Sequence, residues 1–262
     1  MTRNYKIVIW HGIVALSAWQ MWSYSGSVSF DSVLGLSFNL AAVTIFVFLV
    51  AIIALGYALF QQRRWILTVT AIVGVIFLLY LGFSWLNLLA IAGFLLFNFY
   101  AVSNTRSNMS GRIRLNTRLA LTSSLYPVII GFFLVFSFAA FQSQLLKDIE
   151  KSERLPSQAR TFIQQIAEQF VGSKIDSDPR QKQAILNQIA GETYHQINTF
   201  LKPYFKYVPP LLAFALFLIL IGLSWIFVWL ATLAGMIIFW LLKKASVISI
   251  EKRQVEAEVL VV

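Results

Sequence analysis

Two long stretches without a charged residue most constrain what this chain can fold into. Residues 36–60 and residues 208–242 contain 25 and 35 consecutive positions with no Asp, Glu, Lys or Arg. A helix that crosses a hydrocarbon core of about 30 Å needs roughly 20 apolar residues. Each stretch is therefore long enough for a transmembrane helix, and the second is too long for one straight crossing.

Shorter apolar runs of the same kind occupy much of the remaining chain. The sequence is 58% hydrophobic and 12% charged, against about 25% charged residues in ordinary soluble domains. We predict an all-α, polytopic membrane protein with about six transmembrane helices and a small helical extracytoplasmic insert before the last one. Residues 1–141 form a membrane region with five apolar spans, at about 7–22, 36–60, 65–81, 85–101 and 119–141. The polar insert is 142–207, the long last span 208–242, and the tail 243–262.

Three features of these runs bear on their path. The first run follows Arg3 and Lys6, as in a cleaved signal peptide or in a retained first span. Only residues 82–84 separate the third and fourth runs, which predicts a tight helical hairpin with Gly82 in its turn. The last run is either one helix or a helix broken near Gly222.

The positions of basic residues predict the orientation. Lys and Arg gather before the first run, between the second and third, between the fourth and fifth, and after the last. Short loops rich in Lys and Arg stay in the cytoplasm. We therefore expect both termini and the 243–262 tail to be cytoplasmic, the insert to lie outside, and the chain to reside in a cell membrane, as in a bacterial inner membrane.

The insert at residues 142–207 reads as two or three amphipathic helices. Phe162, Ile166 and Phe170 recur at four-residue spacing and share one helix face. One interpretation is that such apolar stripes pack on one another and on the membrane region. The other is that these three residues lie in the lipid interface or form a face that binds a partner.

Few residues suggest chemistry. The chain has no cysteine, and it lacks the HExxH, GxSxG, P-loop and GxGxxG motifs. We therefore expect no enzymatic activity, catalytic residue, metal or cofactor. Asn39, Asn87 and Asn98 are candidates for polar contacts between helices inside the membrane.

A cluster of arginines follows the fourth run. These residues, which no acidic residue accompanies, are candidates for contact with anionic lipids; they are Arg106, Arg112, Arg114 and Arg118. The expected partners are membrane lipids and other membrane proteins, and not nucleic acid, because the cytoplasmic segments are too short to shape a groove.

These observations favour a non-enzymatic function. The leading prediction is an integral membrane scaffold, assembly factor or subunit of a membrane complex that presents residues 142–207 as an extracytoplasmic helical module. The alternative is a channel or permease for an uncharged or hydrophobic solute, in which the same residues form a lid.

Overall fold

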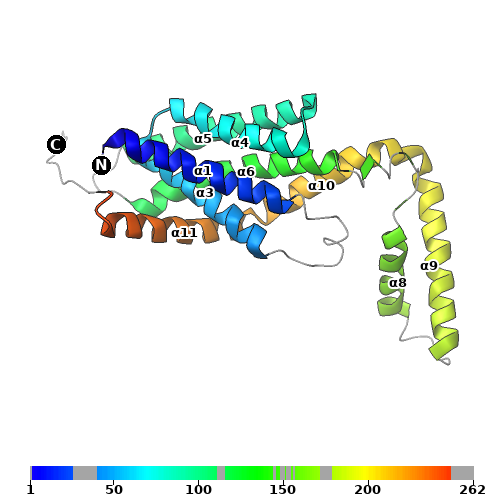
Figure 1. The fold of residues 1–262 in the computed structure, drawn as a ribbon. Helices are drawn as coiled ribbons and strands as arrows, with labels where there is room; N and C mark the ends of the chain where they lie inside the picture. The colour runs from blue at the N-terminus through cyan, green and yellow to red at the C-terminus, as the bar shows by residue number, and fades with distance from the viewer. Residues whose placement is uncertain are drawn as a thin grey trace, which may run out of the picture. The chain divides into compact units, whose positions relative to one another are not determined.

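The computed structural model describes residues 2–25, 40–110, 116–143, 146–147, 151, 155, 157–171 and 179–248, and their regular elements are all helices (Figure 1). The all-α prediction is confirmed for these residues. Six segments among them are long and apolar enough to cross a membrane: Leu40–Phe60, Arg64–Leu81, Trp85–Ser110, Thr117–Phe141, Gln181–Gly222 and Ser224–Lys244.

These six segments are not the six predicted spans. The first predicted run lies in α1 (Arg3–Ser25), which is not one of the six. Polar residues such as His11 and Gln20 interrupt its apolar composition. The last predicted run, in contrast, contributes to two of the six.

The last run is two successive helices, α10 (Val208–Gly222) and α11 (Ser224–Lys244). Leu223 lies between them with φ −87° and ψ −4°, which is close to helical geometry. Its N–H still donates to the carbonyl of Ile219 at 3.0 Å. The chain therefore does not reverse at this position, and the two helices are not the arms of a hairpin.

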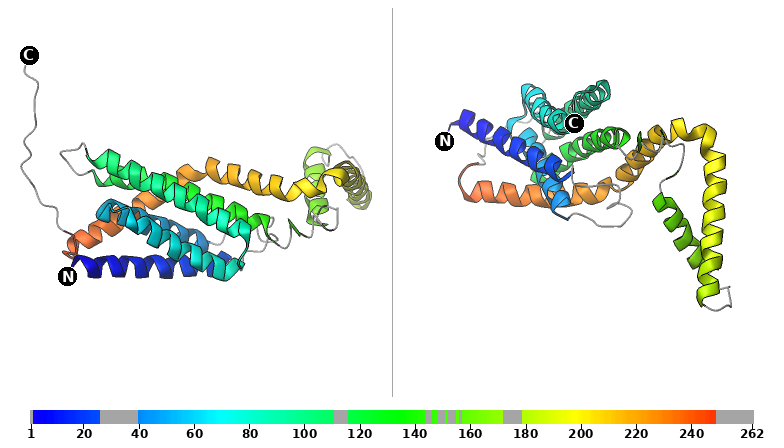
Figure 2. Two further views of the ribbon diagram at one scale, coloured as in Figure 1. Left: turned by 90° about the horizontal axis from the view of Figure 1, so that it is seen from above. Right: turned by 45° about the vertical axis from the view of Figure 1, so that its right-hand side comes forward.

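The chain divides into two compact units. The first, which we call the bundle, holds the described residues up to Phe138 and from Phe217 onward. Within it α1 packs on α3 (Leu40–Phe60) and α4 (Arg64–Leu81), α3 packs on α11, and α4 packs on α5 (Trp85–Ser110) (Figures 1 and 2). The second unit includes Ala139–Leu216. It holds α8 (Ser157–Val171), α9 (Pro179–Leu201), the 3₁₀ helix η1 (Lys202–Tyr207) and the start of α10.

The connection between α4 and α5 is the predicted hairpin turn. Gly82 ends α4 with φ +82°, a conformation that favours glycine, and its N–H donates to Leu78 at 2.9 Å. Ser84 then caps α5, because its Oγ accepts a 3.2 Å hydrogen bond from the N–H of Asn87. The side-chain amide of Asn87 donates a 2.8 Å hydrogen bond to the Gly82 carbonyl. The helical hairpin is thus confirmed.

The helix that contains the fourth predicted span extends beyond it. Its apolar run ends at position 101, but α5 continues to Ser110. Ala101, Val102 and Thr105 are buried there, and the Thr105 hydroxyl donates to the Ala101 carbonyl at 2.9 Å. Hydropathy marks where polar residues begin, and packing keeps this polar extension helical.

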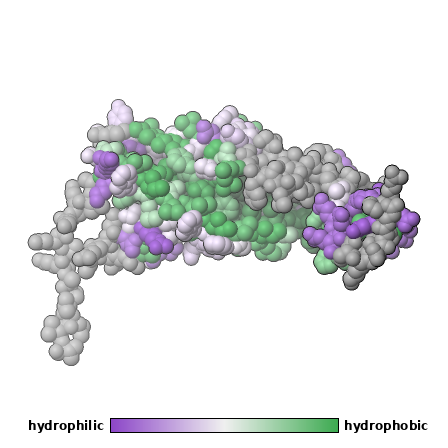
Figure 3. All heavy atoms as spheres, turned by 90° about the horizontal axis from the view of Figure 1, so that it is seen from below, coloured by the Kyte–Doolittle hydropathy of each residue, from purple (hydrophilic) through white to green (hydrophobic). Residues whose placement is uncertain are grey.

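Glycines let the helices of the bundle approach one another closely, since each leaves room for a large side chain of a neighbouring helix. The pairs are Gly56 with Trp10, Gly74 with Ile91, Gly93 with Leu134, Gly131 with Phe94, and Gly235 with Leu121. Apolar side chains cover much of the bundle face seen in Figure 3, and hydrophilic ones appear at the end where α1 begins and α11 ends.

Candidate functional site

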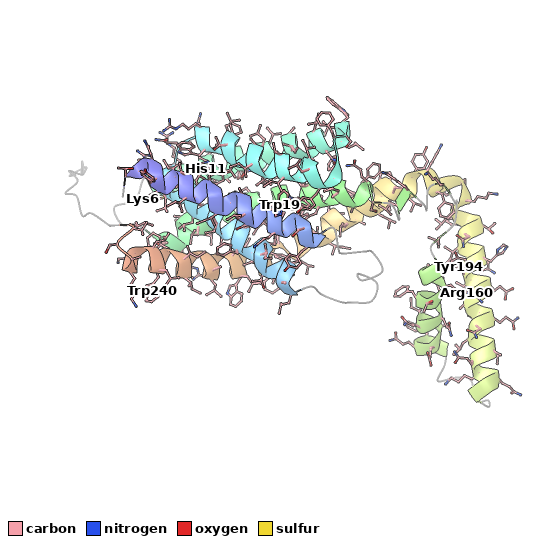
Figure 4. All side chains as sticks on the ribbon, viewed as in Figure 1. Lys6, His11, Trp19, Arg160, Tyr194 and Trp240 are labelled. Atoms are coloured by element: carbon pink, nitrogen blue, oxygen red, sulfur yellow. The ribbon has the colours of Figure 1, made fainter. Side chains whose placement is uncertain are left out.

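The helices α8 (Ser157–Val171) and α9 (Pro179–Leu201) pack against each other in the second unit, and we call them the α8–α9 pair. Small side chains contribute to their contact, since Ala167 and Ala190 are buried. Arg160 of α8 lies over Gly191 of α9, where an added Cβ would be 3.4 Å from its Nη2 atom. Figure 4 labels Arg160 where α8 and α9 lie side by side.

The large apolar residues of α8 are not used in this contact. Phe162, Ile166 and Phe170 are 57%, 40% and 72% exposed. They are four residues apart and form one row along the helix, which we call the apolar row. Within their own unit these three side chains are therefore not covered by α9. That they pack on the membrane region, lie in the lipid interface or bind a partner stays a prediction.

Leu155 ties the segment before α8 to the far end of α9. Its backbone N–H donates to Oδ1 of Asn198 at 2.8 Å, and its carbonyl accepts a hydrogen bond from the Tyr194 hydroxyl. The leucine side chain packs against a small core in which Leu146 and Phe205 are each 1% exposed. Both backbone polar groups of this residue are thus satisfied by α9.

Basic residues gather at one end of the bundle. The helix termini at that end carry, among the described residues, Arg3, Lys6, Arg63, Arg64, Arg106, Arg118, Lys243 and Lys244. Figure 4 shows Lys6 and Trp240 at this end. The described part of the bundle contains no Asp or Glu. This basic end therefore has no ion-pair partner within the described bundle.

Hydrogen bonds join the helices at the basic end. Lys6 Nζ donates to the carbonyl of Val247 at 2.6 Å, which links the first turn of α1 to the segment after α11. The Gln61 amide lies 3.5 Å from the sulfur of Met109 on α5. The first contact joins α1 to the segment after α11, and the second joins the end of α3 to α5.

The candidate lipid-binding arginines are only partly described. Arg106 near the end of α5 and Arg118 at the start of α6 (Thr117–Phe141) are both exposed at the basic end. Arg112 and Arg114 lie outside the described residues. The structure therefore places two of the four arginines on the same end of the bundle.

The three candidate asparagines have different surroundings. Asn98 is buried, and its Oδ1 accepts a 2.8 Å hydrogen bond from the Tyr57 hydroxyl of α3 while its amide donates to Phe94. Asn87 is buried in the turn described above. Asn39 lies outside the described residues. The structure thus brings Asn98 to a contact between helices and Asn87 to a local cap.

Sequence reasoning missed Asn104. Pro127 lies inside α6 and has no N–H, so the carbonyl of Ser123 loses its usual partner in that helix. The side-chain amide of Asn104 on α5 donates to this carbonyl at 2.8 Å. Pro127 could have revealed the unpaired carbonyl, but only the packing of α5 on α6 reveals the donor.

Hydrogen bonds and aromatic contacts hold the His11 ring in place. Its Nδ1 is 2.8 Å from the Ile7 carbonyl and its Nε2 is 2.8 Å from the Thr68 hydroxyl of α4. The ring also lies edge-on to Trp10 and Trp65, with centroids at 4.6 Å and 5.3 Å. Within the described residues, no three His, Asp or Glu side chains come together in a way that could hold a metal.

Comparison of the chain with protein-family models, curated proteins and solved structures found no match.

Proposed function

We propose that this protein is a non-enzymatic scaffold or subunit of a membrane complex. The bundle is its membrane anchor, and the α8–α9 pair presents the apolar row to another protein on the extracytoplasmic side. Six apolar helical segments support a multi-pass anchor. The α8–α9 pair supplies the surface that a partner would recognise.

The observation that carries this proposal is the exposure of the apolar row. Ala167, on another face of the same helix, is buried. The sequence thus provides small residues where α8 meets α9 and leaves large apolar residues outside. Burying a Phe or Ile side chain stabilises a complex by roughly 2 kcal/mol.

The spacing of the row suits a helical partner. Apolar anchors at i, i+4 and i+8 are the pattern by which an amphipathic helix binds an apolar groove or a second helix. Polar residues flank the row on α8, such as the exposed Gln165 and Gln169. An apolar centre with a polar rim is the usual anatomy of a specific protein interface.

The basic end supports the proposed orientation. Uncompensated Lys and Arg beside apolar helices remain in the cytoplasm. Both helix termini nearest the ends of the described chain, the start of α1 and the end of α11, lie at this end. The proposed topology therefore has both chain termini in the cytoplasm of a cell membrane.

Replacing Phe162 and Phe170 with serine tests the proposal. The protein would be extracted from its own membranes in mild detergent, and the mass of its complex measured by native mass spectrometry. We expect the wild-type chain to be detected at the mass of a complex with a bound protein, and the double variant at the mass of the chain without that protein. The matched control replaces Gln165 and Gln169 with serine on the same helix and should retain the complex.

The thermal unfolding temperature of each variant separates lost binding from lost folding. Because the two phenylalanines are already exposed, we expect the double variant to unfold within a few degrees of the wild type. An unchanged complex mass in the Phe162→Ser, Phe170→Ser variant would contradict a docking role for the row.

A channel or permease with a lid at residues 142–207 is the alternative proposal. It requires polar side chains that can line a solute path. Asn87 and Asn98 are fully buried and hydrogen-bonded within the protein, which weighs against it. Solute flux in reconstituted vesicles discriminates the two functions, since a scaffold should give no flux above that of empty vesicles.

A further inference from the structure

We propose that η1 (Lys202–Tyr207) and the end of α9 lie in the phospholipid head-group layer, where three aromatic side chains and two lysines hold the second unit at the membrane surface. We call these five residues the aromatic collar: Phe200, Lys202, Tyr204, Lys206 and Tyr207. The inference rests on the proposed membrane anchoring and adds a lipid-binding surface to it.

The aromatic side chains form an exposed row. Phe200, Tyr204 and Tyr207 are 73%, 52% and 55% exposed. The rings of Phe200 and Tyr204 have their centroids 6.2 Å apart, and residues three apart in a 3₁₀ helix, such as Tyr204 and Tyr207, share one edge. Three large rings therefore face outward from one short segment.

A buried residue fixes this outward direction. Phe205 is 1% exposed and packs with Leu146, which is also 1% exposed, and with the partly buried Leu155 and Val208. With Phe205 held inside, its neighbours Tyr204 and Lys206 are exposed. The collar is thus held in place by the core of its own unit.

The charges of the collar suit lipid phosphates. Lys206 Nζ lies over the ring of Tyr207, 4.8 Å from its centroid, so that a cation and an aromatic ring are in contact. Between Glu192 and Glu251 the sequence contains no acidic residue. Lys202 and Lys206 are both exposed, so their ammonium groups can contact anionic phosphate groups.

The chain after the collar identifies lipid as the occupant. The helix α10 follows η1 directly, and its Leu211 and Phe214 are 65% and 60% exposed. Tyrosine and lysine next to an uncharged apolar helix are typical of the membrane interface, where the ring contacts hydrocarbon and the polar tip contacts water. A protein partner would not require this transition from basic aromatic to wholly apolar residues.

The absence of cysteine allows a direct test of depth. A spin label would be attached to single cysteines introduced by Tyr204→Cys and Lys206→Cys in the full chain, reconstituted in vesicles of phosphatidylcholine and phosphatidylglycerol. Collision with oxygen, which concentrates in hydrocarbon, and with a water-soluble nickel chelate reports the depth of each label. Gln188→Cys on α9 is the exposed control, and Ile237→Cys on α11 reports membrane insertion.

We expect both collar labels to show oxygen and nickel accessibilities between those of the Gln188→Cys and Ile237→Cys labels. Lys202→Gln with Lys206→Gln, read from the Tyr204→Cys label, should raise nickel accessibility at least twofold, whereas Lys182→Gln on α9 should not. Collar labels as hydrated as Gln188→Cys, with Ile237→Cys in hydrocarbon, would overturn the collar alone. A hydrated Ile237→Cys label would overturn the membrane anchor and the collar together.

Discussion

The side-chain amide of Asn104 donates a hydrogen bond to the backbone carbonyl of Ser123, across the contact between α5 and α6. Ser123 is four residues before Pro127, and a proline cannot donate to the carbonyl four residues earlier. An unpaired carbonyl is costly in an apolar environment, where neighbouring helices commonly supply the missing donor. Asn104 is that donor, and Asn108 in turn donates to its Oδ1 at 3.1 Å.

This relationship predicts coupling between Asn104 and Pro127. We expect Asn104→Leu to lower the free energy of unfolding by roughly 1–2 kcal/mol, because the Ser123 carbonyl is left unpaired. In a Pro127→Ala background the new N–H at position 127 can pair with that carbonyl, so the same substitution should cost less. Unfolding in mixed micelles of the four proteins measures the difference; equal costs in both backgrounds would disprove the coupling.

A second prediction concerns Gly56. The Trp10 indole donates to the Ile52 carbonyl at 2.9 Å, and a Cβ added at Gly56 would clash with that ring. Gly56→Ala must displace the indole, and overpacking of this kind costs roughly 1–3 kcal/mol of stability. Gly12→Ala is the control, since nothing lies within 4 Å of its added Cβ. Thermal unfolding should show a lower midpoint for the Gly56 variant only.

A third prediction concerns the attachment of Leu155 to α9. Asn198→Leu removes the acceptor of the Leu155 N–H and should destabilise the segment by roughly 1–2 kcal/mol. Hydrogen exchange of the peptides that contain Leu155 and Tyr194 should then accelerate about tenfold. Gln196→Leu, at an exposed position of the same helix, should leave exchange unchanged; similar rates in both variants would refute the role assigned to Asn198.

A fourth prediction concerns topology. Single cysteines introduced by Gln188→Cys and Lys244→Cys have no competing thiol in this chain. If the basic end is cytoplasmic, a membrane-impermeant maleimide should label the Gln188 variant in intact cells and label the Lys244 variant only after the membrane is opened. Labelling of Lys244→Cys in intact cells would show that the orientation is reversed.

Much of the fold could be predicted because helix formation depends on local sequence. The Ser84 cap, the left-handed Gly82 and the apolar runs on either side define the α4–α5 hairpin within a few residues. The end of α5 could not be found in this way. Hydropathy changes at position 101, but the buried Thr105 and the Asn104 bond keep the helix intact for two more turns.

The sequence by itself determined that the described elements are helices, where the uncharged runs lie, and that basic residues recur at alternate ends of those runs. Only the tertiary structure decided that Phe162, Ile166 and Phe170 stay exposed and that Asn104 meets the Ser123 carbonyl. The reason is that composition and periodicity act within one helix. Which side chains meet across helices depends on the rotation and offset of one helix against another, and small residues such as Gly56 and Ala167 set how closely they approach.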